Sequence, residues 1–125
     1  MIKLGINGFG RIGRLALRIV MQKYLDRIQP VAVNTSGSMD INGWAHLFVY
    51  DSIYGKYSGE VKVEGGSMII DGTAIPVLGQ KEPAQIPWDQ YGAEVVIEST
   101  GKFLDSSGAG QQLKPGVKRI VLSAE

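Results

Sequence analysis

Short apolar runs that end at glycine or polar clusters recur along the chain, a pattern typical of strands buried in a sheet. The segments that fit this pattern are Ile2–Asn7, Pro30–Val33, Glu94–Glu98 and Val117–Leu122. Between Glu60 and Leu78, polar and apolar residues alternate instead, interrupted by Gly-Gly and Asp-Gly pairs that suit tight turns. We therefore expect buried strands together with an antiparallel hairpin insertion, whose strands are Glu60–Glu64, Ser67–Ile70 and Thr73–Leu78.

Helical periodicity separates these strands. The apolar residues that recur at helical spacing after Arg11 are Ile12, Leu15, Ala16, Ile19 and Val20. We expect this set to face the core and the opposite face to meet solvent, with Arg14, Arg18, Gln22 and Lys23. Ile41–Tyr50 predicts a second helix that begins near Asp40 and carries His46 on its rim, with an apolar face of Ile41, Trp44, Ala45 and Phe48. Asp105–Leu113 predicts a third helix.

The order of these elements indicates the class of fold. Strands that alternate with helices favour a mostly parallel, doubly wound α/β sheet with helices on both faces. A length of 125 residues with 44% hydrophobic composition fits one domain over residues 1–125. We therefore expect a single α/β domain that contains the hairpin insertion.

Composition removes several classes of function. Thirteen basic and twelve acidic residues give a net charge of +1, too small for the positive field that nucleic acids or anionic membranes require. The absence of Cys excludes disulfides, thiolate metal sites and a cysteine nucleophile within this chain, and we expect no metal. No signal-peptide pattern and no membrane-spanning run is present, so we expect a cytoplasmic location.

Gly8, Gly10 and Gly13 form the pattern G-x-G-x-x-G between the first predicted strand and the first predicted helix. Gly8 suits a tight turn, Gly10 leaves the backbone bare for a pyrophosphate, and Gly13 lets the helix pack on the strand. Unpaired N–H groups and the dipole at the helix start then favour phosphate. The pattern predicts a Rossmann-like dinucleotide site, and its alternative is a glycine-rich turn without a ligand.

The ten residues from Gly5 to Arg14 resemble the N-terminal signature of phosphorylating glyceraldehyde-3-phosphate dehydrogenases. The similarity covers essentially the whole chain, through Tyr50–Ser52, Gly55–Lys56, Ile86–Trp88, Glu98–Gly101, Phe103, Val117–Arg119 and Ser123–Ala124. It implies an NAD(P)-binding half of an oxidoreductase that converts a phosphorylated aldehyde to an acyl phosphate in glycolysis or gluconeogenesis.

The resemblance also implies which residues bind the cofactor. Around the adenosine and pyrophosphate it implies Asn7, Phe9, Gly10, Arg11 and Ile12, beside Gly8 and Gly13 of the glycine turn. Toward the adenine and ribose it implies Asn34, Lys81, Thr100, Gly101 and Phe103, and near the nicotinamide riboside it implies Ser123. Alternative roles are a turn for Asn34, a cap for Thr100, the core for Phe103 and a solvated charge for Lys81.

Thr35 is a departure from the usual NAD site, which has an acid about 20 residues past the third glycine to bind the ribose hydroxyls. An acid there would repel the 2′-phosphate of NADP. Thr35 and Ser36 remove that repulsion and supply hydroxyls that can donate to phosphate oxygens. We therefore expect either NAD or NADP as the cofactor.

The catalytic Cys of the family and its His partner have no counterpart in this chain. His46, Asp51 and Ser52 lack a partner at a spacing that suggests catalysis, so we expect no catalytic residue here. The resemblance then implies a complementary catalytic domain or chain, an exposed sheet edge at the last strand and a homo-oligomer, the family being usually tetrameric. The alternatives are a free-standing dinucleotide-binding module and half of an erythrose-4-phosphate dehydrogenase-like enzyme.

Overall fold

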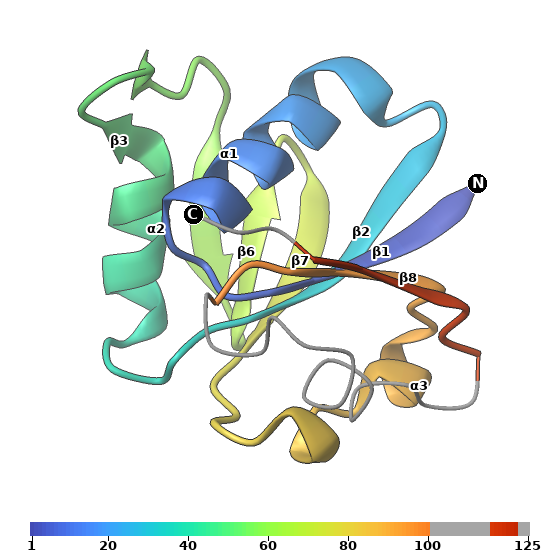
Figure 1. Ribbon diagram of the computed structural model, residues 1–125. Helices are drawn as coiled ribbons and strands as arrows, with labels where there is room; N and C mark the ends of the chain where they lie inside the picture. The colour runs from blue at the N-terminus through green and yellow to red at the C-terminus, as the bar shows by residue number, and fades with distance from the viewer. Residues whose placement is uncertain (101–115, 123–125) are drawn as a thin grey trace.

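The computed structural model describes residues 1–100 and 116–122, so the predicted helix Asp105–Leu113 lies outside the described residues. The described residues form a seven-stranded sheet (Figure 1). Its strands lie in the order β5 (Val61–Glu64), β6 (Ser67–Ile70), β7 (Thr73–Leu78), β2 (Ile28–Asn34), β1 (Ile2–Asn7), β8 (Val95–Glu98) and β9 (Arg119–Leu122). Each strand predicted from the sequence is therefore present, with bounds that shift by a few residues.

Most of this sheet is parallel. β1 pairs in parallel with β2 on one side and with β8 on the other, and β8 pairs in parallel with β9. β6 is antiparallel to both β5 and β7, which confirms the hairpin insertion. β7 also pairs in parallel with β2 through Val33–Val77 and Asn34–Leu78, so the insertion continues the main sheet.

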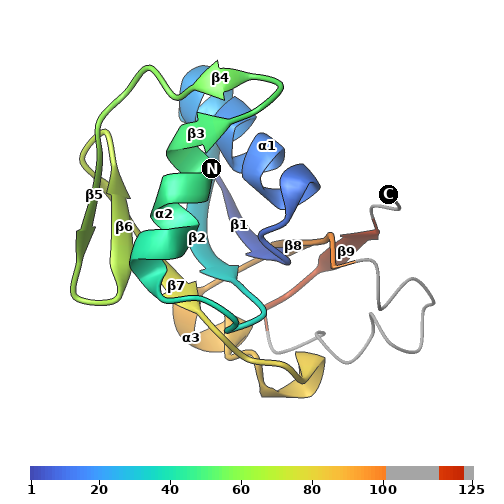
Figure 2. The ribbon, with the colours of Figure 1, turned by 90° about the vertical axis from the view of Figure 1, so that its left-hand side faces the viewer.

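Helices cover both faces of the sheet, which confirms the α/β prediction. α1 (Arg11–Ile19), extended by a π-helical turn over Val20–Tyr24, and α2 (Ile41–Val49) lie on one face, and α3 (Trp88–Tyr91) lies on the other (Figures 1 and 2). A 3-10 turn, Pro83–Gln85, precedes α3. Asp40 caps α2 by accepting a hydrogen bond from the N–H of Gly43 at 2.9 Å. No helix in the described part of the chain is long and apolar enough to cross a membrane.

The buried face of α1 differs from the predicted one. Leu17 is fully buried and Val20 is buried, whereas Ile19 is 39% exposed. Leu15 and Ala16 are half-buried. Gly13 has no side chain to hold the helix away from the sheet, so the row that runs through Gly13 and Leu17 faces the core.

The prediction that Arg18 meets solvent is wrong. Arg18 is only 6% exposed, and the carbon of its guanidinium lies 5.8 Å from the ring centroids of both Phe48 and Tyr57. It donates hydrogen bonds of 2.8 to 3.1 Å to the carbonyl oxygens of Phe48, Val49 and Gly55. These acceptors lie at the end of α2 and in the small hairpin of β3 (Tyr50–Asp51) and β4 (Gly55–Lys56), which periodicity within α1 does not reveal. The buried guanidinium is tolerated because Nε and Nη2 donate to carbonyl oxygens.

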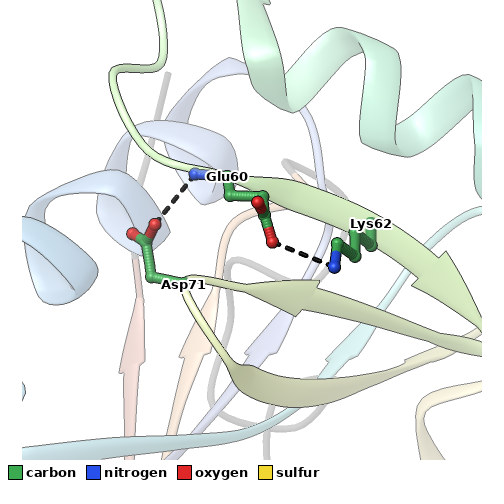
Figure 3. Close-up of polar contacts among 3 residues, drawn as sticks. All are labelled: Glu60, Lys62 and Asp71. Atoms are coloured by element: carbon green, nitrogen blue, oxygen red, sulfur yellow. Dashed lines mark hydrogen bonds and ion pairs between the residues drawn. The ribbon is translucent and has the colours of Figure 1, made fainter.

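The turn between β6 and β7 is held by a carboxylate. Asp71 adopts the left-handed backbone region at φ 50° and accepts hydrogen bonds of 2.8 Å from the N–H of Glu60 and from the hydroxyl of Tyr57. Glu60 in turn forms an exposed ion pair of 3.2 Å with Lys62 on the edge strand (Figure 3). Burial and the hydrogen bond to Asp71 raise the pKa of Tyr57. The insertion is thereby tied to the segment that follows β4.

Candidate functional site

A cavity of about 510 Å³ opens where β1, β2, β7 and β8 end, a size typical of small-ligand sites. Parallel α/β sheets bind ligands at this carboxyl edge. The predicted cofactor residues that line the cavity are Asn7, Gly8, Phe9, Gly10, Asn34, Thr35, Lys81 and Thr100. The lining also includes Ser36, whose hydroxyl was expected to meet a phosphate, and Trp44, Gln80 and Ser99, which were not predicted to bind cofactor.

The remaining predicted residues are placed differently. Arg11, Ile12 and Gly13 form the first turn of α1 and do not line the cavity with their side chains. Gly101, Phe103 and Ser123 lie outside the described residues. Trp44 was assigned to the core from its helical spacing, and it is indeed buried while it also borders the cavity. Gln80 and Ser99 could have been identified from their positions, because each follows the end of a predicted strand.

The three glycines have the geometry that a phosphate-binding turn requires. Gly8 has φ 99°, and a Cβ there would lie 2.8 Å from backbone atoms of Ser99 and Thr100. At Gly10 nothing lies within 4 Å of the place where a Cβ would be, so the backbone is open to a ligand. A Cβ at Gly13 would overlap the carbonyl oxygen of Gly8. A side chain at Gly8 or Gly13 would therefore disturb the turn itself, whereas one at Gly10 would occupy the space open to a ligand.

Phe9 anchors the turn to the core. Its ring is buried, stacks on Phe48 with centroids 6.1 Å apart and meets Trp44 edge-on at 6.2 Å. Its carbonyl oxygen accepts a hydrogen bond of 3.0 Å from Nη1 of Arg14 on α1. The turn is thus held from α2 by packing and from α1 by a hydrogen bond, which keeps Gly10 in place beside the cavity.

A hydrogen-bonded network joins four neighbouring segments beneath the cavity. We call it the Glu98–Gln80 network, and its members are the buried residues Glu98, Asn7 and Asn34 and the exposed residue Gln80. Nδ2 of Asn7 donates to Oε1 of Glu98 at 2.7 Å. Nδ2 of Asn34 donates to Oδ1 of Asn7 at 2.8 Å and to the carbonyl oxygen of Gln80 at 2.9 Å. The N–H of Gln80 donates back to Oδ1 of Asn34 at 2.9 Å. Glu98 was not predicted as part of the site.

Thr35 does not present its hydroxyl in the way that the sequence suggested. The residue is buried, and Oγ1 donates to the carbonyl oxygen of Leu78 at 2.8 Å while it accepts from the N–H of Gly37 at 3.1 Å. Its one hydroxyl proton is therefore directed into the protein. Ser36 is exposed beside the cavity, 2.8 Å from the hydroxyl of Ser38, and so is better placed to meet a ligand.

The polar groups of α2 and of the following hairpin lie away from the cavity. His46 is exposed, and its ring centroid is 4.8 Å from that of Tyr50. Asp51 accepts hydrogen bonds from the N–H groups of Tyr54 and Ile53, which lower its pKa. These contacts make a turn in the hairpin, so the carboxylate of Asp51 has a structural role there.

A doubly wound sheet with a bare glycine turn and a helix start at its carboxyl edge defines a dinucleotide-binding domain. The profile of the family described as "Glyceraldehyde 3-phosphate dehydrogenase, NAD binding domain" matches residues 2–106. The chain belongs to this family.

Curated relatives agree with this assignment. The chain is 46% identical over 124 residues to glyceraldehyde-3-phosphate dehydrogenase of Danio rerio. It is 45% identical over 124 residues to glyceraldehyde-3-phosphate dehydrogenase 2 of Agaricus bisporus, and 47% identical over 122 residues to glyceraldehyde-3-phosphate dehydrogenase 2 of Schizosaccharomyces pombe. These alignments cover 98 to 99% of this chain but only 36% of each relative. The chain therefore spans just over a third of the length of these proteins.

Proposed function

We propose that residues 1–125 form one domain that binds the nicotinamide dinucleotide of a phosphorylating glyceraldehyde-3-phosphate dehydrogenase. The observation that carries the proposal is the cavity at the carboxyl edge, bordered by the bare backbone of Gly10 next to the start of α1. A pyrophosphate needs close backbone approach and N–H donors, and this arrangement suits both. When bound, the nicotinamide supplies a hydride acceptor for aldehyde oxidation.

The residues of this chain would bind and orient the dinucleotide, while a separate catalytic part would carry out the covalent chemistry. Covalent aldehyde oxidation in this family needs a thiolate nucleophile, and this chain has no Cys. We propose that a catalytic part, on the same polypeptide or on a second chain, supplies the thiolate and its base. The complete protein would act in the cytoplasm and assemble as a homo-oligomer.

The cofactor is proposed to be either NAD or NADP. No acid occupies position 35 or 36, so the negative charge that would repel a 2′-phosphate is absent there. The exposed hydroxyl of Ser36 and the ammonium group of Lys81 on the cavity rim supply polar groups of the kind that a phosphate binds. This lining supports the use of both cofactors.

The test is calorimetric titration of the 125-residue chain with NAD and NADP in parallel, with light scattering on the same sample. Binding of both cofactors within about tenfold of each other supports dual use. NAD binding with NADP more than about tenfold weaker keeps the domain assignment and rejects dual use. A folded chain that binds neither rejects the proposal that this domain holds the dinucleotide by itself.

A further inference from the structure

Glu98 is a fully buried carboxylate beneath the cavity, at 0% exposure. It does not line the cavity itself, but Asn7, Asn34, Gln80 and Thr100 all do. Burying a carboxylate is unfavourable unless donors replace its water, and here Asn7 and both the N–H and the hydroxyl of Thr100 do so at 2.7, 3.0 and 2.6 Å. Its position suggests that it acts on a ligand through these neighbours.

The hydrogen bonds of the Glu98–Gln80 network can run in only one direction. The N–H of Gln80 can only donate, so the atom of Asn34 that faces it must be the oxygen. A carboxylate can only accept, so the atom of Asn7 that faces Glu98 must be the nitrogen. The bond from Nδ2 of Asn34 to Oδ1 of Asn7 is then determined from both ends. The carboxylate at one end and the peptide at Gln80 at the other thereby fix the orientation of the two amides between them.

We propose that Glu98 is a positioning residue for the dinucleotide. Through Asn7 and Asn34 it holds the cavity wall at Gln80, next to Lys81, and through Thr100 it holds a second part of the wall. The proposal rests on the proposed function, because an effect on affinity requires that the dinucleotide occupies this cavity. The carboxylate contacts no ligand; it orients the groups that do.

Glu98→Gln replaces one acceptor oxygen by an NH₂ donor at nearly constant volume. If the new NH₂ faces Asn7, both amides must turn over, and the N–H of Gln80 loses its acceptor. If the new NH₂ faces Thr100, the N–H of Thr100 loses its acceptor instead. In either case one residue of the cavity wall, Gln80 or Thr100, loses a hydrogen bond that fixes its position. Affinity for NAD is then expected to fall roughly tenfold, as for the loss of one hydrogen bond.

Adding Asn7→Asp to Glu98→Gln moves the carboxylate one place along the network. The new carboxylate at position 7 can accept from Nδ2 of Asn34 and from the new NH₂ at position 98. The amide oxygen at position 98 can then accept from Thr100, so every donor regains an acceptor. Asn7→Asp alone would place two carboxylates against each other. A Glu98 that merely fills space would not be rescued in this way.

The experiment measures hydrogen exchange of the Gln80 and Thr100 amides by ¹⁵N NMR in the ligand-free chain, and NAD affinity by calorimetry. The samples are the wild type, both single variants, the double variant and Glu64→Gln, which makes the same chemical change at an exposed position. We expect exchange at Gln80 or at Thr100 to rise at least tenfold in each single variant, because each leaves a mismatch between positions 7 and 98 or between positions 98 and 100, and to return toward the wild-type rate in the double variant. The rescue is judged from hydrogen exchange and not from NAD affinity, because the negative charge moved to position 7 would also repel the cofactor phosphates.

Unchanged exchange at both amides and unchanged NAD affinity in Glu98→Gln would overturn the proposal, and so would a double variant no better protected than the single ones. If Glu98→Gln alone does not fold, the double variant still decides, since the proposal requires it to fold with a protected Gln80 amide. A wild type that binds no NAD would reject the proposed function, whereas the exchange measurements would still decide whether Glu98 positions Gln80.

Discussion

Gly10 and Thr35 occupy two places where one side chain would decide what enters the cavity. Gly10 has open space in place of a Cβ, so its backbone is the surface offered to a ligand. Thr35 lies at the end of β2 with its hydroxyl bonded to Leu78. At the scale of the residue, the proposed function thus makes cofactor recognition depend on the missing Cβ at Gly10 and on the lack of a negative charge at Thr35.

Gly10→Val should abolish measurable dinucleotide binding and leave the fold intact. Gly10 has φ −74° in extended backbone, which Val adopts readily, and the added side chain would fill the space that the pyrophosphate needs. Calorimetry measures the binding and circular dichroism the fold. Arg11→Ala is the control, since the exposed guanidinium of Arg11 matters less than the backbone. Unchanged affinity in Gly10→Val would remove the pyrophosphate from this turn.

Thr35→Asp should shift the preference between NADP and NAD at least tenfold toward NAD. The new carboxylate would repel the 2′-phosphate and accept hydrogen bonds from the ribose hydroxyls of NAD. Parallel titrations measure the ratio of the two affinities. Thr35→Asn is the matched control, because it has the same shape without the charge. An equal shift in Thr35→Asn would show that charge at this position does not select the cofactor.

Single residues also join elements to one another. Arg18 ties α1 to the end of α2 and to the β3–β4 hairpin. Gly5, in the middle of β1, gives room to Trp88 of α3: a Cβ there would lie 2.7 Å from Cε3 of the indole. Each face of the sheet therefore has one such residue: Arg18 joins the elements on the α1 side, and Gly5 makes room for α3 on the other.

Arg18→Leu should lower the free energy of unfolding by about 2–4 kcal/mol, because three buried or half-buried carbonyl oxygens lose a charged donor. Urea unfolding followed by tryptophan fluorescence measures this. Arg27→Leu is the control, since that side chain is 76% exposed and pairs only weakly with its neighbour Asp26. Equal stability of the two variants would contradict the anchoring role of Arg18.

Gly5→Ala should destabilise the domain by about 1–3 kcal/mol through displacement of Trp88 from β1. In the background of Trp88→Leu, whose smaller side chain leaves room for the methyl group, the same change should cost clearly less. A double-mutant cycle on urea unfolding measures the coupling. Additive effects would show that the Gly5 position does not serve the docking of α3.

Element types and their order were predictable because they depend on local periodicity and turn residues. The three strands of the insertion and the Asp40 cap of α2 were found at their expected places. The buried face of α1 was not, since Leu15 and Ile19 fit a helical stripe as well as Leu17 does. Only packing against the sheet distinguishes these two stripes.

At the scale of the whole molecule, β9 is an edge strand of the sheet. Its side chains Val121 and Leu122 are 50% and 44% exposed. Edge strands and exposed apolar side chains mark surfaces suited to further packing. The chain covers 36% of its relatives, and the catalytic part that we propose would supply such packing.

The chain alone should therefore bind cofactor without oxidising an aldehyde. Joined to the remaining part of the Schizosaccharomyces pombe relative, with which it shares 47% identity, it should gain NAD reduction with glyceraldehyde 3-phosphate and inorganic phosphate. Absorbance of NADH measures this, and Gly10→Val in the joined protein is the control. Turnover by the isolated chain would contradict the division of roles. A joined, folded protein that binds cofactor without turnover would favour a free-standing binding module.

The sequence by itself determined the α/β class, the strands, the glycine turn and the family, because each follows from a pattern of residues that are neighbours along the chain. Only the tertiary structure decided that β7 also pairs with β2, that Arg18 is buried and that Glu98 accepts a hydrogen bond from Asn7. Asn7 and Glu98 are 91 positions apart, and Arg18 and Phe48 are 30 apart. Such contacts depend on how separate elements pack, and no local pattern of residues encodes that packing.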